Sequence, residues 1–114
     1  MDVLTEADFD GARLKRAGPV VVTFVADWCG SCRRFAPIAT AYAEKHPDVP
    51  HAFADASDDD GPLWDAFGLE IVPSIAAFYD GELVARRDGK RGWGLPEDAP
   101  AEMAAALRRR MRGG

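Results

Sequence analysis

The sequence predicts an α/β fold in which a central mixed β-sheet is flanked by helices, in the order βαβαβαββα. Two observations support this prediction. Residues 20–25 (VVVTFV) form a nearly unbroken apolar run rich in β-branched residues, which is typical of a strand buried on both faces and paired in parallel. Asp80-Gly81 lies between two further candidate strands and is typical of a tight hairpin turn, which pairs strands antiparallel. The expected sheet is therefore mixed.

Size and charge limit the classes of protein that the chain can belong to. A length of 114 residues and a hydrophobic content of 47% suit one domain over residues 1–114. The formal net charge of -5 disfavours binding to a nucleic-acid backbone, which requires a basic surface. Pro, Gly or charged residues interrupt every apolar run before it reaches the roughly 18 residues of a membrane helix. We expect a monomer that binds neither nucleic acid nor a membrane.

The N-terminal segment is expected to form the first helix. Thr5 and Asp8 resemble a capped helix start, and the flanking Leu4 and Phe9 resemble its hydrophobic staple. Gly18 is the expected end of this helix. The buried strand at residues 20–25 then follows.

The second helix begins directly after that strand. From Cys32 to Pro47 apolar residues recur at helical spacing, namely at Phe35, Ile38, Ala39 and Tyr42. Pro37 lies inside this segment and is expected to kink the helix, because proline lacks an N–H and clashes with the preceding turn.

The second half of the chain is expected to add three strands and two helices. A weaker strand at residues 51–56 precedes the acidic run Asp58–Asp60, which we interpret as a solvated cap before a short helix from Pro62 to Gly68. Two strands at residues 74–79 and 82–86 form the expected hairpin. The last helix has an apolar side formed by Met103, Ala106, Leu107 and Met111, and its C-terminal dipole is opposed by Arg108, Arg109, Arg110 and Arg112.

The chain contains two cysteines, and only three positions separate them. No further pair exists that could form a structural disulfide framework, so a reducing compartment is favoured. The first eight residues carry acids where an export signal would carry Lys or Arg followed by an apolar run. We therefore expect a cytoplasmic protein.

The two cysteines lie in Trp28-Cys29-Gly30-Ser31-Cys32, where a buried strand passes into a helix. Cys29 is expected at the helix N-terminus, where unpaired N–H groups and the positive end of the dipole favour its thiolate. Cys32 lies one turn later and is more shielded. This asymmetry predicts that Cys29 attacks a target disulfide and that Cys32 then attacks the Cys29 sulfur of the mixed disulfide.

This motif resembles that of the thioredoxin family. Further residues at family-like spacing extend the resemblance over nearly the whole chain: Leu4-Thr5, Phe9-Asp10, Leu14-Lys15, Gly18, Phe24, Ala26, Pro37, Gly68, Val72-Pro73, Asp80-Gly81-Glu82 and Gly89. The resemblance implies a thioredoxin fold and no bound cofactor. It also implies that Pro73 is a cis proline, which holds the Val72 backbone beside the cysteines to pair with an extended substrate segment. Trp28, Gly30 and Ser31 complete the implied substrate-binding surface.

The chain departs from the family pattern at several positions. Thr23 stands where the family commonly has a buried aspartate that assists the second cysteine, and a hydroxyl cannot accept a proton as a carboxylate can. An ungapped register places Ala54 where the family often has a lysine partner of that aspartate. A register shifted by one residue places Asp55 there instead, as a substitute base. Ser31 replaces the commoner proline between the cysteines, which leaves the turn less rigid.

The surface around Gly89 also departs from the family pattern. It is often apolar in the family, but here it carries Asp88, Lys90 and Arg91, so the choice of partner is expected to differ.

A zinc site completed by the two histidines, His46 and His51, is the competing interpretation of the cysteine pair. We consider it the weaker one and expect both histidines at the surface. Trp64 and Trp93 are expected to pack in the core or against loops.

The sequence thus predicts a thiol:disulfide oxidoreductase that reduces protein disulfides and is recharged by a thioredoxin reductase or another dithiol donor. Two alternatives remain open. One is a carrier of thiol-disulfide exchange that serves one dedicated partner. The other is a non-catalytic redox-sensing or interaction module that uses the fold as a scaffold.

Overall fold

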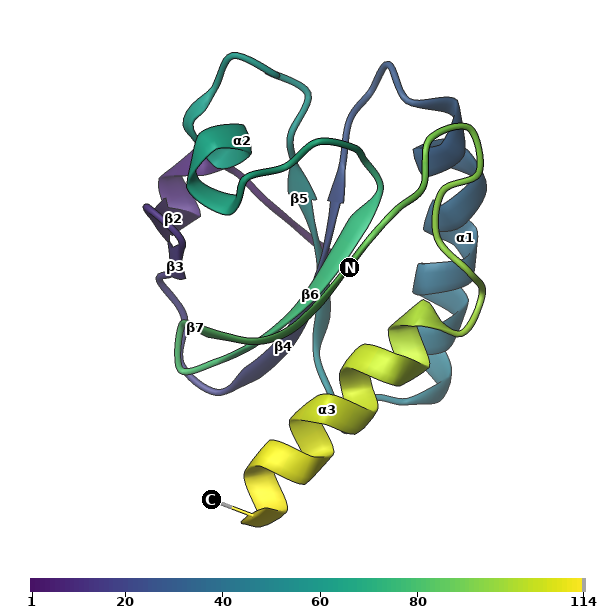
Figure 1. The fold of residues 1–114 in the computed structure, drawn as a ribbon. Helices are drawn as coiled ribbons and strands as arrows, with labels where there is room; N and C mark the ends of the chain where they lie inside the picture. Colours follow the sequence, from purple (N-terminus) through teal and green to yellow (C-terminus); the bar gives the residue numbers. More distant parts are fainter. Residues whose placement is uncertain (114) are drawn as a thin grey trace.

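A five-stranded sheet forms the centre of the computed structural model, which describes residues 1–113 (Figure 1). The strand order is β1-β5-β4-β6-β7. β1 and β4 pair with β5 in parallel, whereas β6 pairs with β4 and β7 antiparallel. The bounds are β1 Asp2–Leu4, β4 Pro19–Val25, β5 His51–Asp55, β6 Ser74–Tyr79 and β7 Glu82–Asp88. The predicted mixed sheet is therefore confirmed.

β4 is the central strand because it has a paired strand on each side. Its residues 20–24 are all buried, as expected for an apolar run that faces packed layers on both sides of the sheet. Val20, Val22 and Phe24 belong to one core cluster, and Val21 belongs to the other. Because successive side chains of a strand point to opposite faces of the sheet, this one run of residues contributes to both cores.

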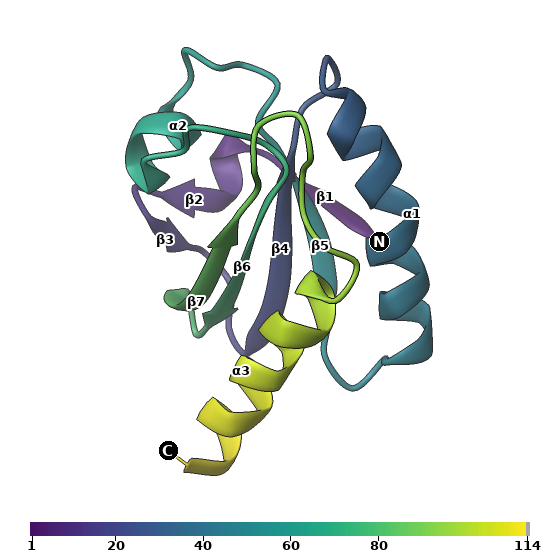
Figure 2. The same cartoon turned by 45° about the vertical axis from the view of Figure 1, so that its right-hand side comes forward.

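Helices cover both faces of the sheet (Figure 2). α1 (Gly30–Lys45) and α3 (Ala99–Gly113) pack on one face and contact each other, and α2 (Pro62–Phe67) lies on the other. α1 ends near the predicted position and contains Pro37. Met111 is exposed, so the apolar side of α3 ends one turn earlier than predicted. None of the helices within residues 1–113 is long and apolar enough to span a membrane.

The predicted first helix is wrong. Thr5 and Asp8 do form a capping box, but it starts only a 3₁₀ turn over Glu6–Asp8, labelled η1. The chain then forms two short antiparallel strands, β2 (Phe9–Asp10) and β3 (Arg13–Leu14), joined through Gly11 at a φ of 59°. A left-handed glycine stops a helix, and the paired strands bury both Phe9 and Leu14.

The C-terminal ends of β4, β5 and β7 meet the start of β6 at one end of the sheet. The register places Phe24 opposite Ser74, and Ser74 opposite Asp88. The predicted Asp80-Gly81 turn joins β6 to β7 at the opposite end, and β7 continues two residues beyond its predicted end, Arg86. The loops that follow β4, β5 and β7 are consequently neighbours, and they build the site.

Candidate active site

The two cysteines lie where β4 passes into α1. Cys29 is the N-cap of α1, and its Sγ accepts the backbone N–H of Cys32 at 3.1 Å. The Cys29 thiol also donates to the carbonyl oxygen of Val72 at 3.4 Å. Both thiols are free, and Cys29 is 8% exposed whereas Cys32 is 3% exposed. The structure therefore places Cys29 at the helix N-terminus, as predicted from the sequence, and leaves it the more accessible of the two.

The environment of Cys32 disfavours its ionised form. Burial, and next the hydrogen bond with Cys29, raise the pKa of the Cys32 thiol to about 12. Arg33 acts in the opposite direction, as does the backbone at Ala26. None of the groups that act on Cys32 within residues 1–113 is a carboxylate. Cys32 consequently stays a thiol at neutral pH.

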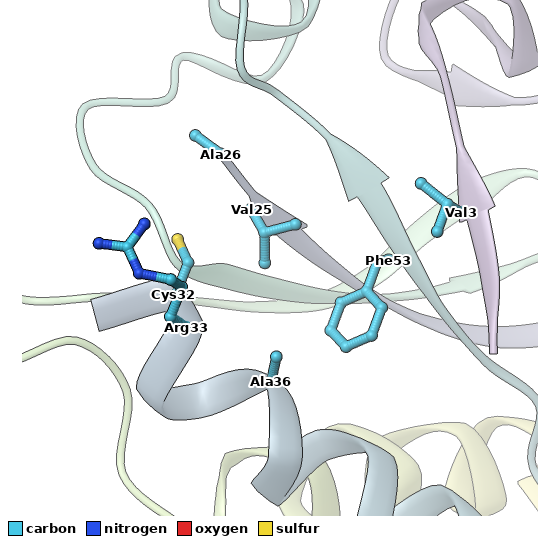
Figure 3. Close-up of a pocket in the computed structure, with 7 residues that line it drawn as sticks. All are labelled: Val3, Val25, Ala26, Cys32, Arg33, Ala36 and Phe53. Atoms are coloured by element: carbon cyan, nitrogen blue, oxygen red, sulfur yellow. The ribbon is translucent and has the colours of Figure 1, made fainter. Parts of the chain in front are cut away.

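An apolar hollow lies beside Cys32, between the start of α1 and the strands β1, β4 and β5 (Figure 3). Its lining is almost entirely apolar and consists of Val3, Val25, Ala26, Cys32, Arg33, Ala36 and Phe53. No carboxyl group lines it within the part of the chain that the structure describes. The hollow therefore offers the Cys32 sulfur an apolar surrounding rather than a proton acceptor.

The residue opposite Thr23 on β5 is Phe53, not Ala54 or Asp55. Ala54 pairs with Phe24 and belongs to the core on the other face, so the ungapped register is wrong by one residue. The residue found opposite Thr23 lies one position before Ala54, whereas Asp55 lies one position after it. Asp55 lies exposed at the end of β5, where it accepts the hydroxyl and the backbone N–H of Ser57 at 2.5 and 3.0 Å.

Trp28 forms part of a pair of indoles at the edge of the site. Its side chain is 53% exposed and stacks on Trp64, with 6.2 Å between ring centroids. Each indole N–H donates to a backbone carbonyl of the β5–α2 loop, Trp28 to Ser57 at 2.7 Å and Trp64 to Ala56 at 2.9 Å. Trp64 was expected only to pack, and its contact with Trp28 has no signal in the sequence, because 36 positions of chain separate the two residues.

The Val72-Pro73 bond is cis, as the resemblance implied. The loop after β7 packs closely against it. A Cβ at Gly89 would overlap the Pro73 carbonyl oxygen, so only glycine fits this position without a shift of the backbone. A Cβ at Gly94 would lie 3.2 Å from the Ser31 Cβ, which shows that the same loop also borders the residues between the cysteines.

The histidines do not approach the cysteines. His46 caps the C-terminal end of α1 and His51 begins β5, whereas both cysteines lie at the N-terminal end of this 16-residue helix, about 24 Å away. A zinc site that combines them is therefore excluded by the fold. His51 is buried rather than exposed, which corrects the expected surface position. Trp93 is 55% exposed, so it does not pack in the core.

A dithiol at a helix N-terminus, beside a cis X-Pro bond on a mixed sheet, places this chain in the class of thiol:disulfide oxidoreductases. The family model described as Thioredoxin matches residues 1–95. The chain therefore belongs to the thioredoxin family.

Individual relatives agree with this assignment. The chain is 31% identical to Thioredoxin 1 of Synechococcus elongatus over 81 residues, which cover 71% of this chain and 76% of that protein. It is 36% identical to the thioredoxin of Geodia cydonium over 83 residues, with the same two shares. It is also 35% identical to protein disulfide-isomerase A3 of Gallus gallus over 89 residues, which cover 77% of this chain and 17% of that larger protein.

Proposed function

We propose that this thiol:disulfide oxidoreductase reduces protein disulfides with Cys29 as the nucleophile and Cys32 as the resolving thiol. The observation that supports these roles best is the position of the Cys29 sulfur at the N-cap of α1, where the Cys32 N–H donates to it at 3.1 Å. Such a donor and the positive end of the helix dipole stabilise a thiolate more than a thiol. Cys32 is more deeply buried and has a pKa of about 12, so it is the weaker first nucleophile.

The exchange proceeds in two balanced steps. The Cys29 thiolate attacks one sulfur of the partner's disulfide, the partner's S–S bond breaks, and the other sulfur leaves as a thiolate that takes up a proton. Cys32 then loses its proton, and its sulfur attacks Cys29 in the mixed disulfide. The second partner thiolate leaves, and this chain is left with a Cys29–Cys32 disulfide. Two electrons have passed to the partner.

The surface around the Cys29 sulfur is suited to an extended segment of the partner. Trp28, Gly30 and Ser31 border it on the side of α1, and Val72 and Pro73 border it on the side of β6. When a partner segment enters, the Val72 carbonyl, which now accepts the Cys29 thiol, becomes available for pairing with that segment's backbone N–H. These five residues are the substrate-binding surface that we propose.

Each cycle ends with an oxidised dithiol, so a second partner must return two electrons. We infer that a thioredoxin reductase or another dithiol donor does so, with no cofactor bound to this chain. Exchange with such a donor requires a compartment where thiols persist, and we infer a cytoplasmic location on this ground. We also propose that the chain acts as a monomer.

Single-cysteine variants test these roles. We expect Cys29→Ser to abolish the reduction of insulin, because the first attack is lost, and Cys32→Ser to make one attack and accumulate a mixed disulfide. Iodoacetamide at limiting concentration should label Cys29 first in the reduced wild-type protein. Labelling of Cys32 ahead of Cys29 would contradict the assignment.

The same assay separates the alternative functions. Catalytic turnover of insulin with dithiothreitol as the electron donor is expected for a reductase and not for a sensing or interaction module. A carrier dedicated to one partner would reduce insulin and other unrelated disulfide proteins very slowly, although its single-turnover reaction with dithiothreitol would remain fast.

A further inference from the structure

Three cations border the proposed substrate-binding surface on one side. Arg34 lies in the first half of α1, and Lys90 and Arg91 lie in the loop that follows β7. All three are exposed, and we call them the basic rim. Arg33 is not part of the rim, because it donates to the Asp27 carbonyl oxygen and lines the hollow beside Cys32. Their concentration beside the cysteines is notable because the whole chain has a formal net charge of -5.

Direct contacts hold the two halves of the basic rim together. The Arg34 guanidinium donates to the carbonyl oxygen of Trp93 at 3.3 Å and to the Ser31 hydroxyl at 3.5 Å. Lys90 and Gly94 exchange backbone hydrogen bonds of 2.9 and 2.8 Å, which closes the loop into a tight hairpin against Ser31. The Lys90 ammonium lies 5.8 Å from the centroid of the Trp93 ring. The rim is thus anchored next to the residues between the two cysteines.

The charges of the basic rim have no ion-pair partner within residues 1–113. In residues 1–113, five other arginines form ion pairs with carboxylates, namely Arg13, Arg16, Arg86, Arg87 and Arg108, whereas no residue of the rim does. Arg109, Arg110 and Arg112 also lack carboxylate partners among these residues, but they oppose the dipole at the C-terminal end of α3. Arg34 lies near the N-terminal end of a helix, where a positive charge is disfavoured. Helix stability therefore does not account for the rim.

The other side of the site has the opposite charge. Asp58, Asp59 and Asp60 lie in the β5–α2 loop, which accepts the indole N–H of Trp28 through the Ser57 carbonyl. All three carboxylates are exposed. Figure 1 shows this loop and the β7–α3 loop at the same end of the molecule as the start of α1. The acidic loop contacts Trp28, whereas the β7–α3 loop contacts Ser31 and Arg34. A partner that reaches the cysteines consequently meets positive charge on one side and negative charge on the other.

A partly apolar hollow adjoins the basic rim. The exposed ring of Trp93 borders this hollow between α1 and the loop that precedes α3. Ile38, Leu95 and Pro96 contribute its apolar lining, and Arg34 and Glu97 contribute one charge of each sign. An aromatic ring beside two or more cations fits a segment in which an apolar side chain is accompanied by carboxylates.

We infer that the protein substrates of this chain carry an acidic segment beside their disulfide and dock it on the basic rim. The inference rests on the proposed function and adds the charge of the substrate to it. The acidic segment lies over Lys90 and Arg91 and points away from Asp58–Asp60, and an apolar neighbour of its carboxylates packs on Trp93. This arrangement accelerates encounter and orients the disulfide toward Cys29.

Three disulfide peptides of equal length test the inference. They differ only in the residues that flank the disulfide, which are Glu, Gln or Lys, and their single-turnover reduction by the reduced protein is measured. We expect the Glu peptide to react about tenfold faster than the Lys peptide at low salt, with the Gln peptide between them. At roughly 0.5 M salt the difference should shrink to less than about twofold, because exposed charges are then screened.

Charge-reversal variants identify the residues responsible. Lys90→Glu/Arg91→Glu should remove or reverse the order of the three peptides. Lys15→Glu/Arg109→Glu changes the net charge equally at exposed positions away from the site, and this control should keep the order.

The possible outcomes are distinguishable. Equal rates for the three peptides in the wild-type protein overturn the inference and leave the proposed function intact. The same loss of preference in both double variants also overturns it, because net charge alone would then be the cause. If none of the peptides is reduced, the proposed function fails and the inference fails with it.

Discussion

At the scale of single residues, the proton of Cys32 is the main chemical problem of this site. Burial raises the pKa of the Cys32 thiol to about 12, and Thr23 stands where the family commonly has an assisting aspartate. Phe53, opposite Thr23 on β5, supplies neither a charge nor a side-chain hydrogen bond. Neither Thr23 nor Phe53 carries a charge, so the protein does not bury a lysine or an aspartate without its partner.

Resolution of the mixed disulfide should consequently depend steeply on pH. In the mixed disulfide Cys29 has no thiol, but burial, the largest cause, still raises the pKa of Cys32 above its ordinary value. The thiolate fraction of Cys32 then grows about tenfold for each pH unit, so the rate should rise from about pH 6 to 9. Single-turnover reduction of a protein disulfide measures this profile. Asp55→Asn should leave it unchanged, because Asp55 is exposed and bonded to Ser57. A flat profile in the wild-type protein would show that an unrecognised base serves Cys32.

Introducing a carboxylate at this position tests the same point from the other direction. Thr23→Asp should speed resolution near pH 7, because a buried carboxyl group without a cationic partner titrates high and accepts protons there. It should also lower the free energy of unfolding by roughly 3 kcal/mol. Thr23→Asn is the matched control, since the asparagine side chain has nearly the same shape as aspartate and cannot ionise. If both variants resolved the mixed disulfide equally fast, proton transfer to the introduced carboxylate would not be the cause.

At the scale of elements, the loop after β7 depends on a close approach to Pro73. Gly89→Ala should move this loop or Pro73, because the new Cβ would overlap the Pro73 carbonyl oxygen. We expect a loss of roughly 1–3 kcal/mol in the free energy of unfolding and a slower attack on protein disulfides. Urea unfolding and insulin reduction measure the two effects.

Gly92→Ala in the same loop is the control for that prediction. Gly92 has a φ of 76°, and no atom of residues 1–113 lies within 4 Å of the position that a Cβ would take, so its substitution costs backbone strain without a clash. We expect unfolding measurements to show a loss of about 1 kcal/mol and disulfide reduction close to wild type. Equal effects of the two substitutions on reduction would contradict a specific role for the contact with Pro73.

At the scale of the whole molecule, His51 lies where α1, β5 and α3 meet, at the end of the sheet remote from the cysteines. It is buried, and its Nε2 has no hydrogen-bond partner among residues 1–113. The groups around His51 come from three places: Tyr42 lies on α1 with His46 at the C-cap of that helix, Asp48 lies in the following loop, and Arg108 lies on α3. Arg108 forms an ion pair with Asp48 at 3.0 Å. Protonation of His51 would thus disturb the packing of three elements.

This position predicts loss of stability in acid. Burial, and next the charge of His46, lower the pKa of His51 from 6.5 to about 4 in the folded protein. Between pH 6.5 and 4, His51 binds a proton in the unfolded chain but not in the folded protein. The free energy of unfolding therefore falls as the pH falls, by roughly 3 kcal/mol from about pH 7 to 4. Urea unfolding across this pH range should show that the free energy of unfolding of His51→Phe depends less steeply on pH than that of the wild-type protein. His46→Gln should keep most of the slope, and identical slopes for wild type and His51→Phe would exclude His51 as the source.

The sequence by itself determined the mixed sheet, the central strand, most of the later elements and the position of Cys29 at the start of α1. These features depend on short-range patterns: a run of β-branched residues, helical spacing after Cys32 and the Asp80-Gly81 turn. Tertiary structure alone decided the N-terminal segment, where burial of Phe9 against Phe24, Phe67 and Phe78 accompanies two paired strands in place of a helix. It also decided the opposition of Thr23 and Phe53, the stacking of Trp64 on Trp28 and the burial of His51. Each of these joins residues far apart in the chain, and their contact depends on strand register and packing, which local sequence patterns do not encode.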